Sequence, residues 1–82
     1  MNTTDVRKST LELVYNKGYR YITRSITGTV HIHKELPKKK GLYWINKGDL
    51  ALSLSFSDGL FEDVSFEDKQ PLNIAEELGI ID

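Results

Sequence analysis

Two histidines separated by one residue are the clearest candidate for chemistry in this sequence. His31 and His33 alternate with Val30 and Ile32, so both imidazoles would lie on one face of a strand, within reach of one metal ion. Glu35 would be the third ligand on that face. The pattern is nevertheless common by chance, and we favour two half-exposed histidines on the solvent face of a sheet. We therefore predict no metal site and no cofactor.

Enzymatic chemistry has no recognisable motif in the chain. There is no Gly-x-Ser-x-Gly nucleophile elbow, no glycine-rich phosphate loop and no cysteine. A set such as His31, Ser25 and Asp49 has no specificity, because any small domain offers one. Glu62–Asp63 and Glu67–Asp68 lie in a strongly acidic segment, which favours solvated charge over a buried catalytic pair. The sequence therefore predicts a protein that is not an enzyme.

Charge is divided unevenly along the chain. Residues 1–57 hold ten basic and four acidic residues, a net charge of +6, whereas residues 58–82 hold one and eight, a net charge of −7. An acidic surface with interspersed apolar side chains can imitate a nucleic-acid backbone or dock on a basic groove of another protein. The alternative is that the acidic segment folds back on the basic part and the two fields largely cancel. The candidate protein-binding residues are Glu62, Asp63, Glu67 and Asp68.

The basic part offers a different partner. Lysines and arginines interleaved with aromatic residues can follow a nucleic-acid backbone and stack its bases. No RNA-recognition or KH-type signature is present, and a pI near 6.1 is not typical of a nucleic-acid-binding protein. We therefore place nucleic acid behind protein as the expected partner. The residues of this alternative are Arg20, Arg24, Lys34, Lys38, Lys39, Lys40, Tyr21 and Tyr43.

A helix and a hairpin should position the basic residues. Residues 4–17 have helical spacing, with Thr3 or Thr4 as the N-cap, Gly18 as the C-terminal glycine and an apolar stripe of Val6, Leu13 and Val14 that Leu11 and Tyr15 broaden. Residues 19–24 and 29–34 alternate as two strands around a Thr27–Gly28 turn. Ile22, Val30 and Ile32 would share one face of this hairpin, opposite the histidines.

The remaining chain predicts further strands. Pro37 should end the hairpin, and residues 38–41 should form a solvated loop. Residues 42–46 and 49–56 predict two strands, the second burying Leu50, Leu52, Leu54 and Phe56 on one face. Leu60–Phe61 would plug a short turn, and residues 64–66 would form a short edge strand. Asn73 would cap a short helix over residues 74–78 closed by Gly79, although a strand or a frayed tail fits equally.

These elements predict one α+β domain. The 82 residues suit a single domain, in which the N-terminal helix packs on a twisted antiparallel sheet of four to five strands. The first residues are polar and lack the apolar core of a signal peptide, and no apolar stretch is long enough for a membrane span. We therefore expect a cytoplasmic protein without a membrane partner.

Several short motifs resemble small accessory proteins of phages and prophages of Gram-positive bacteria. The motifs are Tyr21-Ile22-Thr23-Arg24, Gly28-Thr29-Val30, Pro37, Tyr43-Trp44-Ile45, the run Leu60-Phe61-Glu62-Asp63-Val64-Ser65-Phe66-Glu67-Asp68, and Pro71. They cover roughly two-thirds of the chain, without the N-terminal helix. The resemblance implies a fold and a setting, the cytoplasm of a bacterial host. Such proteins often bind a host protein, including defence nucleases, and that is the expected function here. A self-assembling structural component remains a third alternative.

Overall fold

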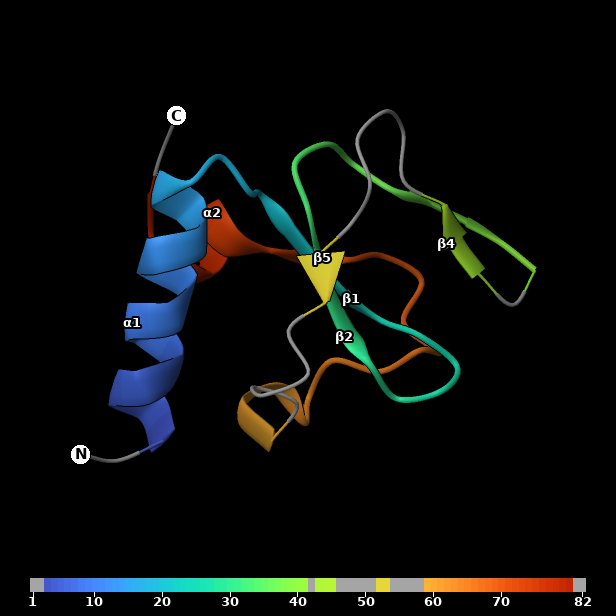
Figure 1. Ribbon diagram of the computed structural model, residues 1–82, viewed down its shortest axis with the longest axis horizontal. Helices are drawn as coiled ribbons and strands as arrows, with labels where there is room; N and C mark the ends of the chain where they lie inside the picture. Colours follow the sequence, from blue (N-terminus) through green and yellow to red (C-terminus); the bar gives the residue numbers. More distant parts are fainter. Residues whose placement is uncertain (1–2, 42, 46–51, 54–58, 81–82) are drawn as a thin grey trace.

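Two helices lie together on one side of a small antiparallel sheet, and a separate hairpin lies at the other end (Figure 1). The computed structural model describes residues 3–41, 43–45, 52–53 and 59–80, with the backbone alone for residues 3, 4 and 43. In chain order the elements are α1 (Thr3–Asn16), β1 (Tyr21–Arg24), β2 (Val30–His33), β3 (Lys38–Lys40), β4 (Tyr43–Ile45), β5 (Leu52–Ser53), β6 (Leu72–Asn73) and α2 (Ile74–Leu78). This arrangement confirms the predicted α+β fold.

Helix α1 ends where the sequence predicts. The amide of Tyr19 donates to the Val14 carbonyl and that of Gly18 to the Tyr15 carbonyl, both at 3.0 Å. This paired pattern needs a left-handed residue after the last turn, and Gly18 supplies it with φ of 102°. The predicted threonine N-cap rests on side chains outside the described residues.

The buried stripe of α1 differs from the predicted one. Leu11 and Val14 are buried, whereas Leu13 is 57% exposed, so its place in the predicted stripe is wrong. Leu11 and Val14 lie on one helical face with Arg7, four residues before Leu11. The stripe therefore continues into a charged residue, which the apolar pattern alone cannot indicate.

Strands β1 and β2 form the predicted hairpin. Ile22 pairs with Ile32 and Thr23 with His31, and the Gly28 amide donates to the Ser25 carbonyl across the turn. Ile22, Val30 and Ile32 are buried on one face, as predicted. The prediction that both histidines lie half-exposed is wrong for His33, whose side chain is only 2% exposed.

Short strands complete the sheet, in the order β5-β2-β1-β6. Strand β5 holds Leu52, which is half-exposed rather than buried as predicted. The other core positions predicted nearby, Leu50, Leu54 and Phe56, lie outside the described residues. On the opposite edge, β6 pairs with β1, and Leu72 faces Ile22.

The predicted lysine loop is instead a strand. Residues 38–40 form β3 and pair with β4 in a two-stranded sheet, with Lys39 opposite Trp44. This hairpin lies at the end of the molecule away from α1, at the right in Figure 1. The trans-strand partner, tryptophan, accounts for the error, because three charged residues do not by themselves predict a strand.

The segment from Gly59 to Gln70 begins with one 3₁₀-helical turn over residues 59–61 and continues as turns and bends. Phe61 is fully buried in the short turn where the sequence places it. The predicted edge strand over residues 64–66 is absent there: the Val64 amide donates to the Phe61 carbonyl and the Ser65 amide to the Asp68 carboxylate. Local side-chain hydrogen bonding by Asp68 therefore replaces a strand.

Helix α2 confirms one of the two alternatives for the C-terminal segment. The Asn73 side chain accepts from the Glu76 amide at 3.1 Å, which caps the first turn. Gly79, with φ of 75°, closes the helix, as its amide donates to the Glu76 carbonyl and that of Ile80 to the Ala75 carbonyl.

One apolar core joins both helices to the sheet. It contains side chains from α1, the hairpin, the turn at residues 59–64 and α2. Its buried members are Leu11, Val14, Tyr19, Ile22, Val30, Ile32, Phe61, Val64 and Ile74.

Candidate functional site

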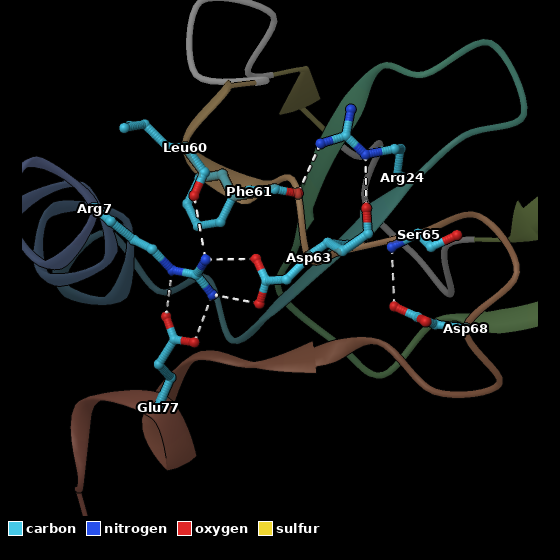
Figure 2. A network of polar contacts seen from close by, with 9 residues as sticks. Arg7, Arg24, Leu60, Phe61, Asp63, Ser65, Asp68 and Glu77 are labelled. Carbon is cyan, nitrogen blue, oxygen red and sulfur yellow. Dashed lines mark hydrogen bonds and ion pairs between the residues drawn. The ribbon is translucent and has the colours of Figure 1, made fainter. Parts of the chain in front are cut away.

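Arg7 connects three segments that lie far apart in the sequence (Figure 2). Its guanidinium donates to both carboxylate oxygens of Glu77 at 2.8 and 2.6 Å and to both of Asp63 at 2.5 and 3.1 Å. Another contact reaches the Leu60 carbonyl at 3.2 Å, and the guanidinium lies 5.0 Å from the centre of the Phe61 ring. α1, the turn at Leu60 and α2 are thereby tied together by one side chain.

Both partners in this ion pair remain charged. The Arg7 hydrogen bonds hold the pKa of Asp63 below its usual value, and the two carboxylates raise the pKa of Arg7 further above neutral pH. A group that stays ionised at every ordinary pH does not exchange protons with a substrate. The cluster is therefore suited to holding the fold together rather than to acid–base chemistry.

The Arg24 side chain binds backbone carbonyls of the acidic segment. Its guanidinium donates to the carbonyls of Val64 and Phe61, both at 2.7 Å (Figure 2), and to that of Gly28 at 2.6 Å. Arg24 lies opposite Val30 in the hairpin register, on the core face, and so points at the turn that covers the core. This arginine, predicted to contact nucleic acid, is engaged with its own chain.

Other basic residues of the predicted nucleic-acid set also have internal contacts. The Arg20 guanidinium lies 3.9 Å from the centre of the Tyr15 ring and donates to the carbonyls of Tyr15 and Tyr19 at 2.9 Å. The Lys34 ammonium lies 5.4 Å from the centre of the Tyr19 ring. Tyr21 is half-buried in β1.

Lys39 anchors the β3–β4 hairpin to the acidic segment. Its ammonium donates to the Phe66 carbonyl, and to that of Asp68 at 3.2 Å. It also lies 4.5 Å from the centre of the Phe66 ring and 5.6 Å from that of Trp44. An isolated two-stranded hairpin is marginally stable in water, so contacts of this kind hold it against the body.

The opposite side of the same hairpin keeps its lysines in solvent. Lys38 pairs with Ile45 and Lys40 with Tyr43, and side chains alternate along a strand, so these pairs lie on the other side from Lys39 and Trp44. Lys38, Lys40 and Ile45 are exposed, and we call them the outer face. Neither Lys38 nor Lys40 pairs with a carboxylate in the described parts of the chain. The Tyr43 side chain lies outside them.

The predicted acidic surface is divided between two basic neighbours. Asp63 pairs with Arg7, although its side chain remains 62% exposed. The backbone carbonyls of Phe66 and Asp68 both accept from the Lys39 ammonium. Glu62 and Glu67 are exposed beside these two positions. Of the four carboxylates, that of Asp63 is ion-paired with Arg7, and that of Asp68 accepts from the Ser65 amide.

The histidine pair does not assemble a metal site in the described residues. His33 Nε2 lies 2.7 Å from the Thr23 hydroxyl, and both side chains are buried. Among the residues whose placement is described, no three histidine or carboxylate side chains come close enough to hold a metal ion.

A pocket beside the hairpin brings Lys69 and Trp44, which the sequence analysis did not name as candidates, next to two predicted lysines. It has a volume of about 470 Å³ and lies between the β3–β4 hairpin and residues 69–71. Lys38, Lys39, Lys69 and Trp44 contribute to its walls. Lys69 is an isolated lysine in an acidic segment, and only the fold brings it to the other lysines.

Comparison with protein families, with curated proteins and with solved structures finds no match to this chain. Neither α1 nor α2, the helices of the described residues, is long and apolar enough to cross a membrane.

Proposed function

We propose that this chain is a non-enzymatic binding module that docks on another protein, with the outer face of the β3–β4 hairpin as its contact surface. The observation that carries the proposal is the position of Lys38 and Lys40, exposed on the projecting hairpin beside Ile45. In the phage or prophage setting that the sequence motifs imply, the partner is a protein of the bacterial host.

The state of the other charged residues supports this choice of surface. Arg7, Arg24 and Lys39 are occupied by carboxylates or carbonyls of the same chain. Their side chains are held against groups of their own chain, so they are less available for direct contact with a partner. Lys38 and Lys40 are exposed and pair with no carboxylate in the described residues, so they can steer an acidic partner.

The apolar neighbours favour a protein partner over nucleic acid. Ile45 is 47% exposed on the outer face, and Leu36, just before β3, is 56% exposed. Apolar side chains bordered by charge are typical of protein interfaces, whereas nucleic-acid surfaces need many basic groups aimed at phosphates. The internal contacts of Arg20 and Arg24 reduce that basic set.

Capture from a nuclease-treated lysate of a Gram-positive host tests the proposal with three tagged proteins. They are the native chain, a hairpin variant with Lys38→Glu and Lys40→Glu, and an acidic-segment variant with Glu62→Lys and Glu67→Lys. All four positions are exposed, so both variants should keep the thermal midpoint of the native protein.

We expect one host protein to be captured by the native chain and by the acidic-segment variant, and to be lost with the hairpin variant. Capture that persists with the hairpin variant would contradict the proposal. Loss with the acidic-segment variant alone would assign the contact to the predicted acidic surface. Material that disappears on nuclease treatment would indicate nucleic acid instead.

A further inference from the structure

The pocket beside the β3–β4 hairpin has a basic wall and an apolar wall. Lys38, Lys39 and Lys69 line it, and no carboxylate does so among the described residues. Pro37, Pro71 and Trp44 supply apolar surface. A pocket with this composition fits a ligand that carries negative charge next to an apolar side chain.

Trp44 adds a hydrogen-bond donor that has no acceptor. Its indole Nε1 is buried and meets no hydrogen-bond partner within the described structure. A buried donor without a partner costs free energy, and most such groups in folded proteins are satisfied. An acceptor that arrives with a ligand would relieve that cost.

From these two observations we infer that the pocket binds an acidic segment of the partner protein, with a carboxylate between the lysines and a hydrogen bond from the Trp44 indole. The inference rests on the proposed docking of a partner protein and identifies the chemistry that the partner presents. Because Nε1 is covered in the unliganded fold, the atoms that cover it must move when the bond forms.

The lysines differ in the part they play. Lys39 already donates to the Phe66 and Asp68 carbonyls and fixes the wall of the pocket. Lys69 is exposed and, in the described residues, pairs with no carboxylate. It is therefore the cation that is free to meet the ligand, whereas the side chain of Lys38 lies on the outer face of the hairpin. Pro37 and Pro71 are rigid neighbours, which limits the conformational entropy lost when the pocket closes on a peptide.

The single tryptophan makes the test direct, because Trp44 gives the only indole N–H signal in a nitrogen-15 correlation spectrum. The labelled protein is titrated with a capped short peptide of alternating aspartate and leucine. A matched peptide of asparagine and leucine and a short oligothymidylate are titrated in parallel. We expect a saturable shift of the indole proton with the aspartate peptide. The asparagine peptide should bind at least about tenfold more weakly.

Three variants separate the contributions. Trp44→Phe keeps a ring and removes the N–H, so the aspartate peptide should bind about threefold to tenfold more weakly, as followed from backbone amides. Lys69→Glu should also weaken binding about tenfold. Lys17→Glu makes the same charge change at an exposed residue just after α1, and should leave binding nearly unchanged.

Other outcomes overturn the inference. These are no binding of any probe, equal binding of the two peptides, an unmoved indole signal, or a stronger indole shift with oligothymidylate. Host-protein capture that depends on Lys38 and Lys40 but survives Trp44→Phe and Lys69→Glu would refute the pocket and leave the proposed docking intact. Capture that fails while the aspartate peptide binds would refute the docking instead.

Discussion

Arg7 of α1 and Asp63, 56 positions later, face each other through two N–H···O contacts of 2.5 and 3.1 Å. The same guanidinium also donates to both carboxylate oxygens of Glu77. The N-terminal helix is thereby joined to the acidic segment and to α2 at one point. Because the arginine continues the stripe of Leu11 and Val14, part of the helix–core contact is ionic.

Replacing Arg7 by lysine should destabilise the fold although it preserves the charge. An ammonium cannot reproduce two bidentate contacts and the bond to the Leu60 carbonyl, so we expect a loss of about 1–2 kcal/mol in the free energy of unfolding. Urea denaturation followed by circular dichroism measures it. Lys8→Arg, at the neighbouring exposed position, is the control and should be neutral. If Arg7→Lys leaves the free energy of unfolding unchanged, the geometry of the guanidinium contributes nothing beyond its charge.

The Arg7–Asp63 pair should also make stability depend on pH. The pKa of Asp63 is lower in the folded protein than its ordinary value of 3.8, so the folded state holds this proton less tightly than the unfolded state does. Its contribution is therefore fully present above the ordinary pKa and is lost as the pH falls through the lower, folded-state pKa. The Asp63 side chain is largely exposed, so salt should reduce the effect.

Asp63→Asn measures this contribution. The variant should be less stable than the native chain at neutral pH, and the difference should shrink as the pH falls below the ordinary aspartate pKa. Urea midpoints of both proteins across that range give the comparison. A difference that stays constant down to acidic pH would show that Asp63 acts through its shape rather than through its charge.

Arg24→Met should cost more than either change at the Arg7 cluster. It keeps an unbranched side chain on the core face and removes the donors to the carbonyls of Phe61, Val64 and Gly28. We expect a loss of about 2–3 kcal/mol in the free energy of unfolding, because partly buried carbonyls lose their partners. Lys17→Met, at an exposed site, is the matched control. If both variants unfold at the same urea concentration, Arg24 does not hold the turn.

Local patterns predicted the elements whose stabilising contacts are close in sequence. The Asn73 cap, Gly18 and Gly79 each act within a few residues, and the alternation of Ile22, Val30 and Ile32 identified the buried face of the hairpin. These features depend on hydrogen bonding and side-chain period, which the sequence carries directly.

The sequence-based predictions that were wrong concern residues whose positions depend on contacts between distant segments. Leu13 was predicted to lie in the buried stripe of α1 but is exposed, whereas Arg7 extends that stripe toward two carboxylates from distant segments. The strand character of Lys38–Lys40 depends on pairing with β4 and on the place of Lys39 against Phe66. The pocket at Trp44 could not be predicted from the sequence, because its walls come from separate segments of the chain.

The buried Thr23–His33 pair supports a last prediction about the hidden face of the hairpin. The Thr23 hydroxyl and His33 Nε2 lie 2.7 Å apart with both side chains buried, so neither atom can turn to bulk water for a substitute. Thr23→Val preserves the shape and removes the hydroxyl. We expect it to lower the free energy of unfolding by about 1–3 kcal/mol, the cost of leaving a buried polar atom without its partner.

Thr23→Ser separates the hydroxyl from the methyl group. It retains the hydrogen bond to His33 and removes one buried methyl, so its cost should be smaller, about 1 kcal/mol. Thr27→Val, in the exposed turn of the hairpin, removes a solvent-exposed hydroxyl contact with Ser25 at 2.7 Å, so it controls for the general effect of valine and should be nearly neutral. Urea denaturation of the three variants shows which contributes more to stability, the hydrogen bond to His33 or the buried methyl group. If Thr23→Ser costs more than Thr23→Val, packing of the methyl rather than the hydrogen bond to His33 stabilises this face.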